Sequence, residues 1–201
     1  MTDFTPSARQ IPMESSRIRI RHVEPKDYER LYEIERDQTT LHTWRYRGKF
    51  PDFKDYEATL WKQTRAILVV ESQKTGEIVG YHHLHDVDDR AGHGWFSVYS
   101  APDKRSTGLA MEGYVLFVDW VFANTPLRWI YAYVFSHNWQ SFDSSVRKGH
   151  ILHVGSMKER LRVDGELTDV HVLAASRELF EKWPLRIRMH KGHARRSEQQ
   201  T

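Results

Sequence analysis

The stretch that decides the fold runs from residue 98 to residue 110 and reads VYSAPDKRSTGLA. Its start alternates as a β-strand does, its middle is small and polar, and a long apolar helical run follows at 109–122. A strand that enters a helix through such a loop leaves several N–H groups unpaired at the positive end of the helix dipole. Phosphate suits this nest, and Gly108 lets the backbone approach it closely. The alternative is an ordinary loop with a capping turn.

Hydrophobic periodicity and turn residues predict the elements on either side of this stretch. Upstream we expect a strand at 16–23, helices at 27–37 and 52–64, and strands at 66–71, 77–86 and 94–100. Downstream we expect a strand at 128–135, a helix at 139–148 stopped by Gly149, and strands at 150–155 and 169–174. The sequence therefore predicts one α/β domain over residues 17–184, with a flexible leader at 1–16 and a basic C-terminal tail at 185–201.

The composition is that of a globular protein and excludes several kinds of chemistry. Of 201 residues, 39% are hydrophobic and 28% are charged. The chain has no cysteine, which excludes disulfides, thiolate catalysis and zinc sites built on cysteine. We find no apolar run long enough to span a bilayer and no secretory signal, so we expect a cytoplasmic enzyme with no membrane partner.

The net charge of +3 is not spread over the chain. Residues 185–201 hold five Lys or Arg and one Glu, whereas the rest of the chain holds 25 basic and 26 acidic residues. The basic residues thus belong to the tail and not to the folded surface, which argues against nucleic acid as a partner. We expect a solvated terminus; a contact with RNA, an acidic protein or phosphate is the alternative.

Two motifs carry a resemblance to a known family. Arg105-Ser106-Thr107-Gly108-Leu109-Ala110 resembles the R/Q-x-x-G-x-G/A signature with which the GNAT superfamily of acetyltransferases binds the pyrophosphate of coenzyme A. Asn138-Trp139-Gln140-Ser141 resembles the N-x-x-S of the branch that includes the ribosomal-protein N-terminal acetyltransferases and many antibiotic acetyltransferases. Ser106 departs from the glycine that is common at its position. Together the likeness covers roughly residues 17–180.

The resemblance implies an α/β (α+β) GNAT fold with acetyl-CoA as cosubstrate. This fold has a mixed, mostly antiparallel sheet of six to seven strands, splayed between the fourth and fifth strands and flanked by about four helices. The pantetheine arm then lies between the splayed strands, and an N–H near Tyr99 or Ser100 holds the thioester oxygen. The cofactor residues implied are Val98, Tyr99, Ser100, Arg105, Ser106, Thr107, Gly108, Leu109, Ala110 and Asn138. For Asn138, the N-cap of the following helix is the alternative role.

The catalytic groups follow from what amine acetylation needs. An ammonium group must lose a proton before it attacks, and His83 and His85, on one face of a strand, are the candidate bases. Strand histidines with an ordinary hydrogen-bonding role are the alternative, and a metal site with Asp86 lacks further ligand spacing, so we expect no metal. The tyrosine that many relatives use as proton donor has no clear counterpart in 139–148, which leaves Ser141 for that role or for closing a helix turn.

The acceptor is less defined by the sequence. Asp169 and His171 share a strand face and are candidates to line its site, and the basic, aromatic loop at 44–50 lies where relatives shape the acceptor pocket. We expect an N-acetyltransferase acting by direct attack of a small-molecule or protein N-terminal amine, and the resemblance leaves room for a homodimer. The alternatives are a coenzyme A-binding protein without catalysis and an enzyme acting on an RNA-linked substrate.

Overall fold

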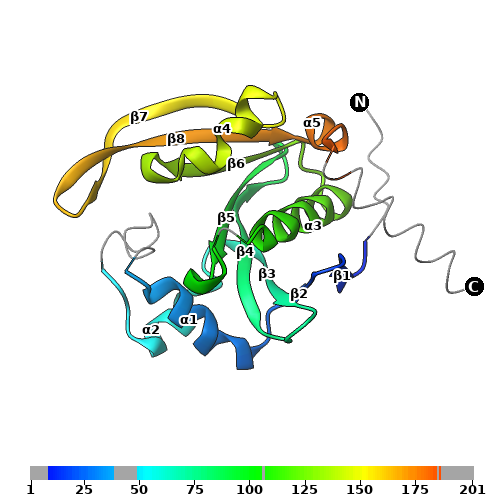
Figure 1. The fold of residues 1–201 in the computed structure, drawn as a ribbon, viewed down its shortest axis with the longest axis vertical. Helices are drawn as coiled ribbons and strands as arrows, with labels where there is room; N and C mark the ends of the chain where they lie inside the picture. The colour runs from blue at the N-terminus through cyan, green and yellow to red at the C-terminus, as the bar shows by residue number, and fades with distance from the viewer. Residues whose placement is uncertain (1–8, 39–48, 106, 185, 187–201) are drawn as a thin grey trace, which may run out of the picture.

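The computed structural model describes residues 9–38, 49–105, 107–184 and 186 (Figure 1). The strands in these residues are β1 (Met13–Glu14), β2 (Ile18–His22), β3 (Thr64–Ser72), β4 (Ile78–Asp88), β5 (His93–Ser100), β6 (Trp129–Phe135), β7 (Leu152–Val163) and β8 (Glu166–Ser176). The α-helices are α1 (Tyr28–Arg36), α2 (Phe53–Thr59), α3 (Leu109–Asn124), α4 (Gln140–Arg147) and α5 (Arg177–Glu181). Three short 3-10 turns complete the list: η1 (Pro25–Asp27), η2 (Pro102–Lys104) and η3 (Ser136–Asn138).

All the described strands form one mixed sheet in the order β1-β2-β3-β4-β5-β6-β8-β7. Neighbouring strands are antiparallel except β5 and β6, which are parallel. The GNAT architecture expected from the motifs is confirmed. The sheet has eight strands in the described residues rather than six to seven, because Met13 and Glu14 pair with β2, and α5 adds a helix that the sequence pattern did not indicate.

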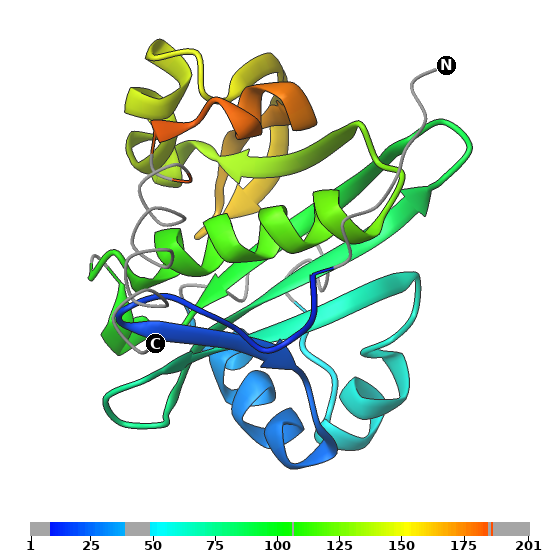
Figure 2. The same cartoon turned by 90° about the vertical axis from the view of Figure 1, so that its right-hand side faces the viewer.

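The two faces of the sheet are covered by different helices. One core joins α3 to alternate residues of β2 and β3, such as Ile18, Ile20 and Leu68. The other joins α1 and α2 to the intervening strand residues, such as Ile67 and Val69. Figure 2 shows α3 lying across one face, with α1 and α2 at the lower end of the sheet. We call these the α3 face and the α1/α2 face.

β5 and β6 part soon after they begin. They are paired at His93↔Trp129, Gly94↔Ile130 and Trp95↔Tyr131, although β5 continues to Ser100 and β6 to Phe135. In Figure 1, β6, β7 and β8 form a layer that turns away from β2 to β5. The expected splay between these two strands is confirmed, and it leaves the second half of β5 paired on one side.

Residues near both ends of the chain dock on α3. Arg9 and Arg186 both contact the carboxylate of Asp119, which is 3% exposed on that helix. With β1, this contact places the described part of the leader expected at 1–16 against the body of the domain. Arg186 is the described part of the basic tail, and its guanidinium also lies 5.4 Å from the Phe180 ring centroid. The other tail residues lie outside the described residues.

The last two strands are longer than their sequence pattern indicates. β7 and β8 continue to a turn at Asp164 and Gly165, whose φ angles are 49° and 89°. The outer half of this hairpin is mostly exposed, so its residues lack the alternation that marks a half-buried strand. A local signal did predict the end of one helix. Gly149 ends the α4 segment with a φ of 70°, as its left-handed cap position predicts.

The second helix is shorter than expected and its start is as expected. The Asp52 carboxylate accepts a hydrogen bond from the Asp55 N–H at 2.9 Å, which confirms the predicted N-cap. α2 ends at Thr59 because Gln63, at a φ of 60°, turns the chain into β3.

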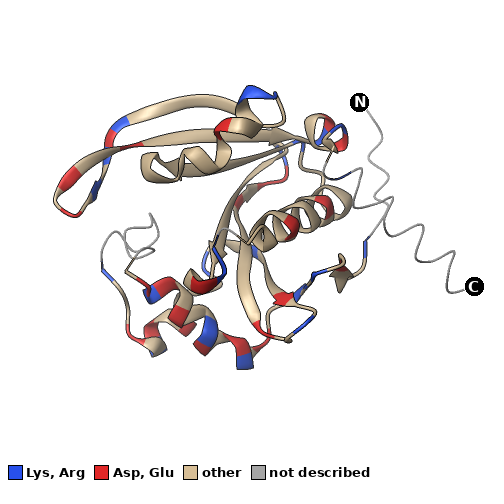
Figure 3. Cartoon of the chain, in the orientation of Figure 1, with Lys and Arg blue, Asp and Glu red and all other residues tan. Residues whose placement is uncertain are grey.

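Charged side chains gather on α1, α2 and the hairpin ends, whereas β5 and β6 carry none (Figure 3). None of the helices in the described residues is long and apolar enough to cross a membrane.

Candidate active site

The start of α3 offers backbone N–H groups to an anion. Gly108 occupies the N-cap position with a φ of 78°, a left-handed conformation that favours glycine. The first backbone hydrogen bond of the helix runs from the Glu112 N–H to the Gly108 carbonyl at 3.2 Å, so the amides before Glu112 have no carbonyl one helical turn earlier within α3. Gly108 and Thr107 are exposed. The first turn of α3 is therefore open to an anionic ligand.

The loop before α3 is closed on itself by a short contact. The Thr107 hydroxyl donates to the Lys104 carbonyl at 2.6 Å and accepts from the Leu109 N–H at 3.4 Å. Ala110 follows in the first turn, half-buried, with a methyl side chain that keeps the helix end narrow. Ser106 lies outside the described residues. Of the rest of the predicted signature, Gly108 is left-handed and Leu109 and Ala110 begin α3, so its role in binding phosphate stays a prediction.

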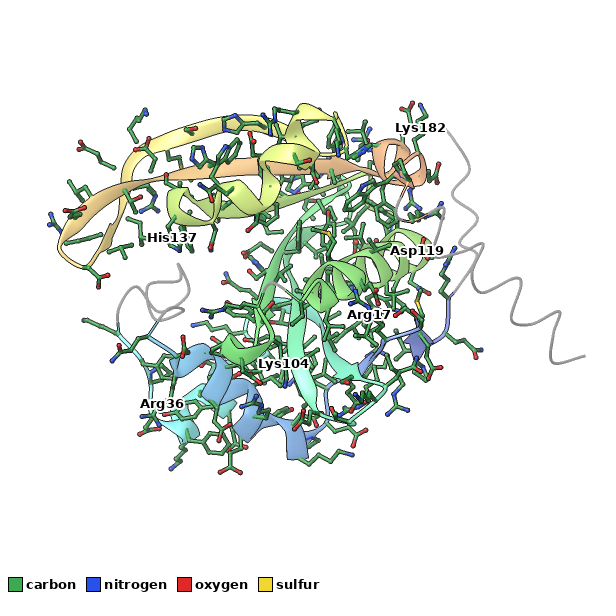
Figure 4. The ribbon with its side chains drawn as sticks, viewed as in Figure 1. Arg17, Arg36, Lys104, Asp119, His137 and Lys182 are labelled. Atoms are coloured by element: carbon green, nitrogen blue, oxygen red, sulfur yellow. The ribbon has the colours of Figure 1, made fainter. Side chains whose placement is uncertain are left out.

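Arg17 reaches this loop from the beginning of β2. Its Nη1 donates to the Thr107 carbonyl at 3.2 Å, and a Cβ built on Gly108 would lie 3.3 Å from its Nη2. Glu112 holds the guanidinium, with Nε donating to Oε1 at 2.7 Å. Figure 4 shows Arg17 beside α3 and Lys104 in the segment that precedes it. The sequence contained no signal for Arg17, because ninety residues separate it from Thr107.

Arg105, the first residue of the signature, lies in the same region but is turned toward α1. Its Nη2 is 3.8 Å from the Asp37 carboxylate. The side chains of Arg105 and Arg17 are 37% and 49% exposed, so both remain within reach of a solvent-side ligand. A diphosphate carries several negative charges, and guanidinium groups pair well with phosphate oxygens. The residues present therefore fit a diphosphate.

The free edge of β5 presents the amides of alternate residues. The Ala101 N–H donates to the Val79 carbonyl of β4 at 2.9 Å. Because antiparallel hydrogen bonding alternates, Tyr99 also faces β4 with its N–H, whereas the N–H groups of Val98 and Ser100 point to the side where β6 has parted. The Val98 side chain is 38% exposed.

Tyr99 is placed differently from Val98 and Ser100. Its side chain is buried in the α1/α2 core and stacks on Tyr81 at 4.6 Å. With its N–H directed at β4 as well, Tyr99 is a poor donor for a thioester oxygen. Of the N–H groups expected near Tyr99 or Ser100, those of Ser100 and Val98 are therefore the ones directed at the free strand edge.

The three histidines of β4, His82, His83 and His85, separate between the two faces of the sheet as strand alternation predicts. His83 and His85 point to the α1/α2 face with their rings 4.8 Å apart, whereas His82 points to α3 and lies against Phe117. His83 Nε2 lies 2.7 Å from the Thr64 hydroxyl, and His85 Nε2 lies 3.3 Å from the Ser97 hydroxyl. Both rings are buried, at 2% and 4% exposure. On the β5 side, the ring of His85 therefore meets the hydroxyl of Ser97.

Asp86 orients the second of these histidines. Its carboxylate lies 2.7 Å from His85 Nδ1, and its side chain is 44% exposed. A β-bulge after His85 gives Asp86 a φ of 46°, and its N–H donates to the Gln63 carbonyl at 3.1 Å. This backbone conformation is sparsely populated by non-glycine residues, and here it brings a carboxylate to the histidine that precedes it. The sequence placed Asp86 beside His85 only as a metal ligand.

Asn138 and Ser141 are both exposed at the end of β6 and the start of α4. Asn138 is the last residue of η3, and the N-cap position of α4 is held by Trp139 without a side-chain hydrogen bond. The alternative role of Asn138 as an N-cap is therefore wrong. Ser141 lies in the first turn of α4, and its role as a proton donor stays a prediction.

The other residues proposed for the acceptor do not join the histidines. Asp169 and His171 do share a face, but it is the α3 face, opposite that of His83 and His85. His171 Nδ1 lies 2.8 Å from the Ser156 hydroxyl, and Lys158 binds Asp169 at 2.7 Å. Of the loop at 44–50, Lys49 and Phe50 are described, and Phe50 packs on Tyr32 of α1 with ring centroids 5.1 Å apart.

A metal site does not emerge at these histidines. Among the described residues, no three or more His, Asp or Glu side chains are grouped so that they could hold a metal ion. Asp86 is used by His85 instead.

Comparison with known proteins agrees with this geometry. The sequence model of the acetyltransferase (GNAT) domain family matches residues 17–147, more than half of the chain. The spermidine N-acetyltransferase from Vibrio cholerae, solved with CoA and spermine, superposes with a TM-score of 0.72 at 17% identity, covering 83% of this chain and 99% of that one.

A second structure, the spermidine/spermine N-acetyltransferase SpeG from Vibrio cholerae with manganese ions, gives a TM-score of 0.67 at 17% identity, over 80% of this chain and 93% of that one. No curated protein sequence matches the chain. The structural likeness shows the fold, and the domain match shows the family. This chain therefore belongs to the GNAT acetyltransferase family and is an acetyltransferase that uses acetyl-CoA as its cosubstrate.

Proposed function

We propose that this enzyme acetylates a primary amine by direct attack, and that His85 accepts the proton which the amine must lose. Bound acetyl-CoA supplies an activated acetyl group. The amides of Gly108 to Ala110 hold its diphosphate, with Arg17 and Arg105 as charge partners. The amides of Val98 and Ser100 bind its pantetheine arm at the free edge of β5. Ser106 and Thr107 complete the loop, and Asn138 orients the arm from the β6 side.

One observation carries the catalytic part of the proposal: His85 lies between a carboxylate and a hydroxyl. Asp86 binds Nδ1 and fixes the ring, so Nε2 is directed at Ser97 on the strand that borders the cosubstrate. A base oriented in this way contributes about 10²- to 10⁴-fold to a proton-transfer step. Because the ring is buried, the amine proton reaches His85 through the Ser97 hydroxyl, and Asp86 stabilises the imidazolium that forms.

His83 and Ser141 have supporting roles in this scheme. The His83 ring packs beside His85 and is held by Thr64, which keeps the pair in place on the α1/α2 face. Ser141 gives a proton to the departing thiolate, a step that needs little help because coenzyme A is a good leaving group. The first turn of α4 leaves this hydroxyl exposed.

The acceptor is a small-molecule amine or a protein N-terminus. The motif at 138–141 supports the second, through its resemblance to the ribosomal-protein N-terminal branch, whereas the two similar structures are enzymes for spermidine. The location that the sequence predicts, the cytoplasm, belongs to the same proposal.

The experiment follows thiol release from acetyl-CoA with DTNB over a panel of primary amines, for the wild type, His85→Gln and Asp86→Asn. We expect His85→Gln to lower kcat/KM by about 100-fold, in the range for loss of a general base. Asp86→Asn should lower it less, because the ring remains but loses the carboxylate that stabilises its cation.

His153→Gln serves as the matched control, since that histidine lies on the opposite face of the sheet. Its rate should equal that of the wild type. Equal rates for the wild type and His85→Gln at every pH would remove His85 from the reaction. Thiol release that needs no amine would remove amine acetylation itself.

A further inference from the structure

A row of aromatic side chains covers the α1/α2 face where β5 and β6 meet. We call Trp95, Tyr131, Tyr133 and Phe135 the aromatic wall. The ring centroids of Trp95 and Tyr133 are 4.3 Å apart at an interplanar angle of 26°, and those of Trp95 and Tyr131 are 5.4 Å apart at 36°. The His137 ring stacks on Phe135 at 5.8 Å and continues the row past the end of β6. Figure 4 shows His137 at that end.

The aromatic wall is not part of a core. In β6, the alternate residues Ile130, Ala132 and Val134 are buried in cores on the α3 face, whereas the wall residues between them are half-buried. The core on the α1/α2 face is built from α1, α2, β3, β4 and the end of β5. None of the four wall side chains belongs to a hydrophobic core within the described residues.

The wall is continuous with the candidate catalytic residues. Trp95 stands opposite His85 in the pairing of β4 with β5, and Ser97 follows on the same face. Trp95↔Tyr131 is the last pair before β5 and β6 part, so Tyr133 lies at the border of the free edge of β5. A group bound on the wall is therefore next to both His85 and the strand edge assigned to the pantetheine arm.

The chemistry of the wall selects a flat apolar group. β5 and β6 contain no Lys, Arg, Asp or Glu. Neighbouring rings run at 26° and 36° to each other, so they form a row to which another ring adds by stacking or by edge-to-face contact. A cage for a cation instead needs ring faces turned toward a common point.

We propose that the aromatic wall binds the acceptor, and that the acceptor is a primary amine joined by a short linker to an aromatic ring. This rests on the amine acetylation proposed above. A polyamine fits poorly, because its several ammonium groups need carboxylates. The strands of the wall, β5 and β6, carry none, and the carboxylate of Asp86 is bound to His85.

The first experiment compares kcat/KM for tryptamine, butylamine and spermidine at saturating acetyl-CoA. Tryptamine should exceed butylamine by about tenfold, the factor expected of one or two aromatic contacts. In Tyr133→Leu and Trp95→Leu the ratio of tryptamine to butylamine should approach one, since leucine keeps the apolar character but removes the ring. Trp61→Leu is the control: this tryptophan is 44% exposed at the end of α2, and its loss should leave the ratio unchanged.

The second experiment measures binding without turnover, by saturation-transfer NMR of tryptamine with the enzyme and CoA. Saturation transfer to the indole protons in the wild type, with loss of that transfer in Tyr133→Leu, supports the wall as a binding site. This holds even if no amine is acetylated, since the absence of acetylation would overturn only the proposed function. Acetylation with equal rates for tryptamine and butylamine would overturn the wall alone. A preference for spermidine over tryptamine would also overturn the wall. Wall variants that lose thermal stability but keep the wild-type ratio of tryptamine to butylamine would overturn it as well, because the wall would then be covered by the chain itself.

Discussion

The two faces of β4 use the same residue type in opposite ways. On the α3 face, His82 is fully buried against Phe117 and Gly113, and neither ring nitrogen has a hydrogen-bond partner in the described residues. On the α1/α2 face, His83 and His85 are just as buried but contact Thr64, Ser97 and Asp86. Burial alone therefore does not mark a catalytic histidine; the partners of the ring do.

The difference extends from the histidines to the whole sheet. On the α3 face a helix packs over the sheet, and the start of that helix presents backbone amides to solvent. The α1/α2 face carries polar side chains with hydrogen-bond partners, and aromatic rings that stack on one another and belong to no hydrophobic core within the described residues. We infer that the first face holds the cosubstrate by its backbone and the second handles the acceptor by its side chains. The predictions below test this division.

The largest effect should follow from filling the nest on the α3 side. Gly108→Trp places a large side chain at a φ of 78°, where the backbone amides must reach phosphate. Loss of two charge-assisted hydrogen bonds should weaken acetyl-CoA binding by about 100-fold in calorimetry. Gly76→Trp is the matched control, since that glycine has a φ of 72° and a Cβ added to it would meet nothing within 4 Å. Equal affinities for both variants would mean that the nest does not bind the cosubstrate.

The second prediction concerns the histidine without partners. Burial lowers the pKa of His82 from 6.5 to about 3, so below pH 6.5 the unfolded chain takes up a proton that the folded chain refuses. The free energy of unfolding should therefore fall as the pH drops from 6.5 toward 3, by about 2 kcal/mol at pH 5. Above pH 7, His82 should cause no loss. Between pH 7 and pH 5, urea unfolding should show a larger loss in the wild type than in His82→Leu, by about 2 kcal/mol, because other groups such as His171, whose pKa burial also lowers, act in both proteins. Equal losses in both proteins would contradict it.

The third prediction concerns the arginine that sequence reasoning missed. Arg17→Ala should weaken acetyl-CoA binding by about tenfold, the value of one exposed charge-assisted contact to phosphate, and Arg17→Lys should weaken it less. Arg19→Ala is the control, because Arg19 lies two residues further along with similar exposure, 43% against 49%, but binds Glu71 on the other face. If Arg17→Ala and Arg19→Ala bind acetyl-CoA with equal affinity, Arg17 pairs with Glu112 but does not contact the cosubstrate.

The smallest effect is expected at α4. Ser141→Ala should lower kcat by only about threefold, because a good leaving group gains little from a general acid, and it should leave acetyl-CoA affinity unchanged. Ser144→Ala, an exposed serine one turn along the same helix, should match the wild type. An unchanged kcat for Ser141→Ala would remove this hydroxyl from the mechanism.

The glycine turn that opens α3 could be predicted from the sequence because it is local. The nest is made by consecutive residues, and a glycine at the N-cap of a long helix leaves a readable pattern. Strand alternation also placed His82 apart from His83 and His85 correctly. These signals act over a few residues, which is the range that periodicity and turn chemistry cover.

What depends on distant contacts could not be predicted. Arg17 meets Thr107 across ninety residues, and the aromatic wall assembles from β5 and β6, which the whole of α3 separates in sequence. Asp86 adopts its position through a β-bulge that also needs Gln63. The alternation Trp129 to Phe135 indicated a strand but not which of its faces stays free of a core.

Amide hydrogen exchange along β5 tests the division between the two faces most directly. Val98 and Ser100 direct their N–H groups toward the free strand edge, whereas Tyr99 directs its own at β4. Saturating CoA should slow exchange at Val98 and Ser100, together with the amides of Leu109 and Ala110, and leave Tyr99 as it is. Unchanged exchange at Val98 and Ser100, with protection appearing elsewhere in the sheet, would contradict the account.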